Sequence, residues 1–231
     1  MTVRMLHASD VHVDNRPEGA KGVVQLIDAA LALDVDLVLM VGDTFDDARV
    51  HQHRLELFVE QVDRFRKPIV ILPGNHDPYM AGCVYERMTL PDHVVVFTEA
   101  DGHHHELPEL GIDLWGRPHR SFNDCRPLQD LPPRGRQRWQ VALAHGHLVR
   151  YPEDRMRSYL ITAEEIAATG RDYVALGHWD VQHDVSAGDV TAWYSGSPHR
   201  FDTCALVTFP PADVSVQRPV VTPVRLGSAR G

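Results

Sequence analysis

Cysteine is scarce in this sequence, and long apolar runs are absent from it. The three cysteines, Cys83, Cys125 and Cys204, are widely spaced and match no Cys-x-x-Cys pattern, which predicts free buried thiols in a reducing compartment. No apolar stretch approaches the roughly 18 residues of a membrane-spanning helix. The apolar segment at residues 1–6 is too short and too weakly basic for a signal peptide. We therefore expect a cytoplasmic protein with no membrane segment.

Internal repeats, low-complexity segments and an excess of positive charge are absent too. The 231 residues are 43% apolar and 24% charged, as in a soluble globular protein, and one domain over residues 1–231 is expected. The formal net charge of −9 argues against a surface that binds polyanions in general. Residues 117–157 are the exception, with nine arginines and four acidic residues. Such a stretch is usually a solvated loop, but this one contains a candidate metal ligand.

Apolar strand-like runs alternate with amphipathic helical stretches, which predicts an α/β architecture. Residues 37–41 form a continuous apolar run that stops at a glycine, as a buried strand does. Residues 127–135 and 210–223 are expected to be surface connections because they are rich in proline or glycine. The expected helices are 20–33 and 49–66. The expected strands are 3–9, 37–41, 68–72, 94–97, 112–115, 140–144, 173–176, 191–194 and 205–209.

Five of the expected strands end in residue types that bind metals. In open α/β sheets the carboxyl ends of the strands gather side chains that are distant in the sequence. Polar residues after one strand can mean only that the strand has ended, but five such ends are hard to explain in this way. The residues concerned are Asp10 and His12, Asp43, Asn75 and His76, His145, and His178.

Each motif has a chemical use, although each alone could also be ordinary turn chemistry. Asp10 and His12 are two residues apart, hence on one face of an extended chain, and a carboxylate with an imidazole suits Mn, Fe or Zn. Asp43 follows a glycine that permits a tight turn, and its carboxylate can bridge two cations. Asn75 offers a neutral oxygen ligand, and His76 beside it is a potential proton donor.

The ordered series Asp-x-His, Gly-Asp-x-x-Asp, Gly-Asn-His-Asp, His and Gly-His-x-Asp resembles the calcineurin-like metallophosphoesterase superfamily over about residues 3–200. The opening His-Ala-Ser-Asp-Val-His at 7–12 and the Tyr-Ser-Gly-Ser-Pro at 194–198 look most like the SbcD/Mre-type DNA repair exonucleases. The resemblance implies a four-layer α/β/β/α sandwich in which two β-sheets face each other and helices lie outside. It also implies a phosphoesterase with two divalent metal ions, Mn before Fe, Zn or Ni.

The superfamily pattern implies seven metal ligands, one of which bridges the two ions. His76 would protonate the leaving oxygen or stabilise the transition state. Asp46 would orient and charge His76. Carried over residue by residue, the ligands are Asp10, His12 and Asp180 for one ion, Asn75, His145 and His178 for the other, and Asp43 as the bridge.

Some positions depart from the pattern or leave a choice. Asp180 stands where the superfamily usually has histidine, which adds negative charge and puts the metal preference in doubt. His145 is preferred to His147 as a ligand because it stands at the end of its strand. The histidine tract at 103–105 is expected to be a solvated loop, since no partner ligand lies at a useful spacing. We also expect no DNA-capping domain within the 231 residues.

Three functions stay open at this point. A nuclease or phosphodiesterase acting on DNA or RNA is supported by the exonuclease-like motifs and the basic segment 117–157. A phosphodiesterase or phosphatase for small phosphate esters is supported by the acidic net charge. A non-catalytic scaffold that binds a protein partner is disfavoured by the intact ligand set. Since fold does not settle the substrate, we favour the nuclease and keep the small-ester enzyme as the alternative.

Overall fold

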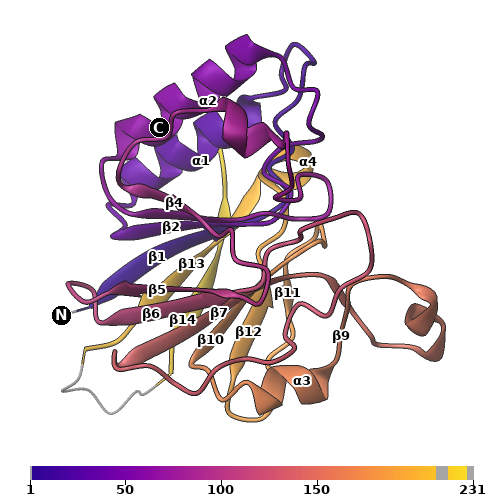
Figure 1. Cartoon of the computed structure of the whole chain (residues 1–231). Coiled ribbons are helices and arrows are strands. Elements are labelled where there is room, and N and C mark those ends of the chain that lie inside the picture. Colours follow the sequence, from indigo (N-terminus) through magenta and orange to yellow (C-terminus); the bar gives the residue numbers. More distant parts are fainter. Residues whose placement is uncertain (1, 212–217, 228–231) are drawn as a thin grey trace.

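A computed structural model describes residues 2–211 and 218–227, which form two six-stranded sheets that face each other (Figure 1). The first sheet has the strand order β14 (Val220–Arg225), β13 (Thr203–Phe209), β1 (Val3–Ala8), β2 (Leu37–Val41), β3 (Ile69–Leu72) and β4 (Val94–Val96). The second has the order β11 (His183–Asp184), β12 (Thr191–Tyr194), β10 (Tyr173–Gly177), β7 (Trp139–His145), β6 (Ile112–Gly116) and β5 (His103–Leu107). A separate pair joins β8 (His147–Leu148) and β9 (Leu160–Ile161).

The centres of both sheets are parallel. β1, β2, β3 and β4 pair in parallel, as do β6, β7, β10 and β12. The antiparallel partners β13, β14, β5 and β11 lie toward the edges. Parallel strands have their carboxyl ends at one edge of a sheet, so loops that are far apart in the sequence meet there.

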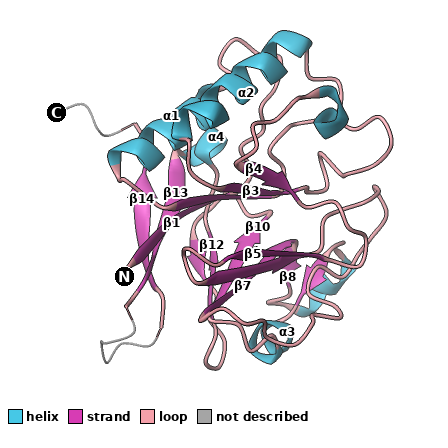
Figure 2. Cartoon of the chain, turned by 60° about the vertical axis from the view of Figure 1, so that its left-hand side comes forward, coloured by secondary structure: helices cyan, strands magenta, loops and turns pink. Residues whose placement is uncertain are grey.

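Helices cover the outer face of each sheet (Figure 2). α1 (Lys21–Ala32) and α2 (Gln52–Phe65) lie on the first sheet, and the short α3 (Ala163–Ala168) lies on the second. α4 (Pro198–Phe201) packs beside α1, and two 3₁₀ turns span Val84–Arg87 and Pro152–Met156. The predicted four-layer α/β/β/α sandwich is therefore confirmed, with a thin fourth layer on the α3 side.

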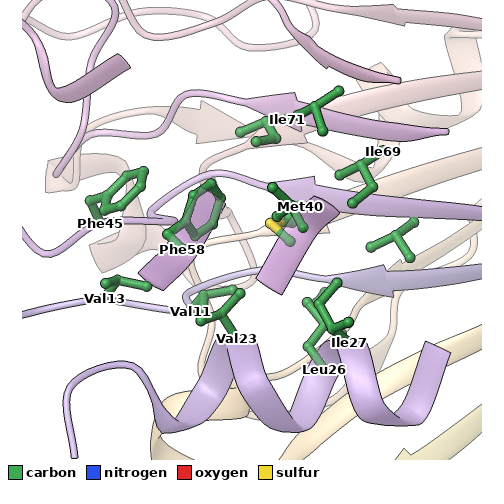
Figure 3. Close-up of a cluster of buried hydrophobic side chains, with 14 of the residues drawn as sticks. Val11, Val13, Val23, Leu26, Ile27, Met40, Phe45, Phe58, Ile69 and Ile71 are labelled. Atoms are coloured by element: carbon green, nitrogen blue, oxygen red, sulfur yellow. The ribbon is translucent and has the colours of Figure 1, made fainter. Parts of the chain in front are cut away.

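Three buried apolar clusters separate these layers. One lies between the first sheet and the helices α1 and α2, where Leu26 and Ile27 of α1 and Phe58 of α2 meet Met40 of β2 (Figure 3). A second fills the space between the two sheets, and a third lies between the second sheet and Ile166 of α3. Each central strand is buried on both faces, which explains the continuous apolar runs of the sequence.

The structure contradicts two local predictions. Residues 103–105 are not a solvated loop but the greater part of β5, where the exposed His104 alternates with the half-buried His103 and His105. Residues 220–223 of the predicted connection belong to β14, an edge strand that can hold Pro223 because it has a single partner. The predicted connection at 212–217 lies outside the described residues.

Two further features bear on the sequence-based expectations. Over residues 2–211 and 218–227, no helix combines the length and apolarity needed to cross a membrane. The three cysteines are unpaired; Cys83 and Cys204 are buried, whereas Cys125 is half-buried rather than fully buried.

Candidate metal centre

The ends of five parallel strands, three from the first sheet and two from the second, bring most of the predicted site residues together. The two sheets are joined directly at this place, because the buried His145 donates from Nδ1 to the carbonyl of Val41 at the end of β2, 2.9 Å away. The strand ends contribute Asp10 and His12 after β1, Asp43 after β2, Asn75 and His76 after β3, His145 at the end of β7, and His178 after β10.

Backbone conformation is unusual at four of these residues. Asp10, His12, Asp43 and His178 have positive φ angles of 53°, 46°, 52° and 103°. A residue with a Cβ adopts this region at a cost of about 1–2 kcal/mol, which the surrounding structure must offset. Such strain concentrated in one place is characteristic of functional sites.

Asp43, Asn75, His145 and His178 form a close group of donor atoms. His145 Nε2 lies 3.2 Å from Asp43 Oδ2 and 3.1 Å from Asn75 Oδ1, and His178 Nδ1 lies 3.2 Å from the same Asn75 oxygen. Two donors about 2.1 Å from one ion are about 3.2 Å apart when they subtend an angle of roughly 100° at the ion. Because His145 donates a hydrogen bond from Nδ1 to the Val41 carbonyl, Nε2 is the ring nitrogen that faces this group.

Asp10, His12 and Asp43 form the adjoining group. Their ligand atoms lie within 4.8 Å of one another, and His12 Nε2 is 3.9 Å from Asp10 Oδ1. Backbone amides aim the two carboxylates, since His178 N–H donates to Asp10 Oδ2 over 3.0 Å and His76 N–H donates to Asp43 Oδ1 over 2.9 Å. Asp43 belongs to both groups of donors, and this is the arrangement that a bridging ligand requires.

Close packing at Gly42 permits this convergence. Gly42 has φ +82°, and a Cβ at this position would collide with the imidazole of His145. Only glycine combines the left-handed backbone with this approach.

Electrostatics differ among the buried groups. Burial raises the pKa of Asp10 to about 6, with Asp43 acting in the same direction. Burial would lower the pKa of His145, but the neighbouring Asp43 carboxylate raises it to about 9. Burial would raise the pKa of Asp43, yet His145 holds it well below the usual range. Burial lowers the pKa of His178 to about 3, so this imidazole is a neutral donor at pH 7.

His76 and Asp46 lie at the open side of the centre. The His76 ring lies 4.9 Å from the His12 ring, and its Nδ1 donates to the backbone carbonyl of Asp46 over 3.0 Å. The Asp46 carboxylate lies nearer to His12, 3.3 Å from Nδ1, than to His76, 4.0 Å from Nδ1. The carboxylate is therefore placed to orient His12, while the backbone of the same residue orients His76.

Asp180 and His147 lie apart from the donor groups. The Asp180 carboxylate is 3.5 Å from a guanidinium nitrogen of Arg200, and Asp180 is not a member of the described clusters of candidate ligands. His147 accepts a hydrogen bond from Trp179 Nε1 over 3.2 Å and lies 3.4 Å from Asp154, whereas His145 is the member of its pair within the donor group.

Three residues that sequence reasoning did not select support the centre. Asp77 accepts from the backbone amides of Gly74 and Phe45 and from the Tyr85 hydroxyl, which fixes the loop after β3. The buried His119 donates from Nε2 to the carbonyl of His145 over 2.9 Å. The position of Asp77 in the Gly-Asn-His-Asp motif was a usable signal, but nothing in the local sequence marked His119.

His199 of α4 is the third. Its ring lies 6.1 Å from that of His12, and its Nε2 lies 3.3 Å from a guanidinium nitrogen of Arg16. It thus borders the Asp10 and His12 side of the centre, next to where Asp180 was expected.

A family model describing calcineurin-like phosphoesterases matches residues 3–182, and the chain belongs to that family. This is the family that the ordered motifs of the sequence predicted. The family generally holds a dinuclear metal centre, and the clusters around Asp43 supply candidate ligands for one.

Two curated relatives come from Bacillus subtilis (strain 168). The SbcD subunit of the nuclease SbcCD is 24% identical over 241 residues, an alignment that covers 85% of this chain and 61% of the relative. The uncharacterized metallophosphoesterase YhaO is 24% identical over 216 residues, covering 83% of this chain and 52% of the relative. The chain thus spans somewhat more than half the length of the relatives that it matches.

Two solved structures share the fold. TT1561 of Thermus thermophilus matches with a TM-score of 0.61 at 10% identity, covering 97% of this chain and all of that one. A structure described as a novel archaeal phosphodiesterase matches with a TM-score of 0.51 at 14% identity, covering 96% of this chain and all of that one. The low identities restrict this likeness to the fold.

Proposed function

We propose that the protein is a dinuclear metal-dependent phosphodiesterase that cleaves DNA or RNA in the manner of an exonuclease, with Mn²⁺ as its preferred metal. The observation that most supports a two-metal centre is the position of Asp43, whose carboxylate belongs to two adjoining groups of candidate ligands. The similarity to a component of the SbcCD nuclease supports a nucleic-acid substrate. The unpaired cysteines support a cytoplasmic location.

The residues present fit two transition-metal ions. One group offers imidazole, carboxylate and amide donors, in which His145 is 3.1–3.2 Å from Asn75 and Asp43 and His178 is 3.2 Å from Asn75. The other group offers two carboxylates and an imidazole. This mixture suits Mn, Fe or Zn. The buried His12 Nδ1 has no hydrogen-bond partner, with the Asp46 carboxylate 3.3 Å away, so the His12 imidazole is available to a metal ion. Asp180 stays a proposed seventh ligand, which would require its carboxylate to turn from Arg200.

The chain's own residues have distinct tasks in hydrolysis. Two ions at this centre would lower the pKa of a water molecule and neutralise charge on the phosphoryl oxygens. Asp10 and Asp43 are held by backbone amides, so the ligands are oriented before substrate arrives. His76 donates a hydrogen bond from Nδ1 to the backbone carbonyl of Asp46, which leaves the protonated Nε2 to transfer a proton to the leaving oxygen.

The surroundings of His76 support a nucleotide as the leaving group. His76 lines a cavity of about 170 Å³ together with Met80 and Phe122, and the Phe122 side chain is 67% exposed. An exposed aromatic ring can stack on a base, which contributes about 1–3 kcal/mol per base. Exposed Arg155 and Arg157 lie in the segment that leads from β8 to β9 and can contact phosphates.

One observation favours the small-ester alternative. Part of the basic segment is neutralised by acids of the same chain, since Arg134 lies 2.8 Å from Asp172 and Arg126 lies 3.6 Å from Glu165. Together with the net charge of −9, this reduces the field available to a long polyanion.

An assay of three substrates with Mn²⁺ distinguishes the proposals. Single-stranded DNA, a bis-aryl phosphodiester and an aryl phosphomonoester are compared in parallel, with Asp43→Ala as the control for contaminating activity. If the protein is a nuclease, it should cleave the DNA. Phe122→Ala should then have a raised KM for DNA and an unchanged KM for the bis-aryl diester. Leu31→Ala, an exposed apolar residue on α1, is the matched control. Hydrolysis of the aryl esters alone would favour the small-ester enzyme.

A further inference from the structure

A second cluster of candidate ligands lies on the hairpin of β5 and β6. His104 and Glu106 are two residues apart on β5 and hence on one face, and Asp113 of β6 is paired directly opposite Glu106. The ligand atoms of the three residues lie within 4.8 Å of one another. Strand pairing thus brings a partner acid to the histidine tract, which the linear spacing did not reveal.

Asp113 is the residue in this cluster that most needs a partner. It is only 2% exposed, and its Oδ2 accepts from Gln140 Nε2 over 2.6 Å and from the amide of Gln137 over 3.1 Å. Its Oδ1 is buried without a hydrogen-bond partner and lies 3.8 Å from His104 Nε2. A buried carboxylate oxygen left unpaired destabilises the folded state, because it has lost its water without gaining a partner.

The pairing of two acids is a separate indication. Like charges directly opposite each other on neighbouring strands destabilise a sheet. Glu106 receives one contact of 3.4 Å, from Gln137 Nε2, and this does not offset the charge of the opposing Asp113. Asp113 and His104 line a cavity of about 210 Å³ that also borders Arg171.

We propose that His104, Glu106 and Asp113 bind a divalent transition-metal ion, with zinc the best match, at a site separate from the catalytic centre. One imidazole and two carboxylates with a water molecule form a four-coordinate set that Zn²⁺ accepts. The ion would fill the space between Asp113 Oδ1 and His104 Nε2 and would fasten the edge strand β5 to β6. Asp113 is paired with Gln140 of β7, and Gln140 lies five residues before the catalytic-centre residue His145 on the same strand. At 3.3 Å per residue, the two sites are therefore about 16 Å apart.

Zinc content measured on the full chain tests this proposal. The protein is dialysed against Zn²⁺, and bound zinc is counted by mass spectrometry in the wild type and in His104→Ala, Asp113→Asn and His105→Ala. We expect His104→Ala and Asp113→Asn to bind one ion fewer than the wild type, with phosphoesterase activity unchanged. His105→Ala is the matched control, because this half-buried neighbour points to the other face of β5 and should keep the ion.

The location of the ion provides the second measurement. Anomalous scattering from a zinc-soaked crystal should give a peak between His104 Nε2 and Asp113 Oδ1. The His104 side chain is 44% exposed, so the His104→Ala variant should fold even if Asp113→Asn does not. Equal zinc content in the wild type and His104→Ala would overturn the proposal. So would a peak at His103 instead, whose Nδ1 lies 3.7 Å from Glu99 Oε1.

Discussion

Replacement of His76 by alanine separates the catalytic role of this residue from metal binding. The His76 side chain is 45% exposed, so its removal leaves no buried cavity and should change the free energy of unfolding by no more than about 0.5 kcal/mol. The bond from the backbone amide of residue 76 to Asp43 Oδ1, 2.9 Å long, survives the change. We therefore expect His76→Ala to keep its metal ions.

The loss should appear in turnover. A general acid contributes on the order of 10²–10⁴-fold, which corresponds to about 2.7–5.5 kcal/mol of transition-state stabilisation. The effect should be large for a diester with a poor alkoxide leaving group and small for one that releases a nitrophenolate, because the latter needs no proton. Steady-state kcat for both substrates, with metal content measured on the same samples, tests this. His53→Ala, an exposed histidine on α2, is the control. If His76→Ala turned over the diester with the alkoxide leaving group at the wild-type rate, His76 would not be the general acid.

Three further predictions concern the metal ions. Asp180→Ala should weaken the binding of one ion selectively, and Asp180→His should shift the metal that gives the highest rate from Mn toward Zn or Ni. If both variants kept the metal preference of the wild type, Asp180 would be excluded as a ligand. The pKa of His145 is about 9 without metal, and its ligand form is neutral, so the binding of an ion releases a proton. Metal affinity measured by calorimetry should therefore rise about tenfold per pH unit from pH 7 to 9. An affinity that does not change with pH would contradict this. Gly42→Ala should lower metal affinity at least tenfold in the same titration, because the new Cβ displaces His145. Gly111→Ala is the control and should leave metal affinity unchanged. Gly111 also has a positive φ, +64°, but a Cβ there would have no neighbour within 4 Å.

Regular apolar patterns made much of the fold predictable. β2 occupies the predicted residues 37–41. This strand was predictable because a strand buried on both faces has an unbroken run of apolar residues. The edge strands β5 and β14 were missed for different reasons. His104 and Glu106 are exposed polar residues, so β5 lacks the apolar signal of a core strand. β14 contains three valines, but Pro219 before it and Pro223 within it made the segment look like a connection.

The candidate site was predictable where its residues are strand ends. Asp43 and His145 meet because parallel strands fix where their carboxyl ends lie. The direction of a side chain in a loop is not fixed in this way, and Asp180 turns to Arg200, a partner 20 residues further on. His199 approaches His12 only through the packing of α4 beside α1, a tertiary contact with no signal in the local sequence.

Anomalous diffraction from crystals of the full chain soaked in Mn²⁺ would locate the pair of ions that Asp43 is proposed to bridge. Two peaks about 3.5–4 Å apart are expected, each within ligand distance of an Asp43 carboxylate oxygen, with no peak at this place in Asp43→Ala. No peak among Asp10, Asp43 and His145 in the wild type, or a single ion that Asp43 does not touch, would contradict this arrangement.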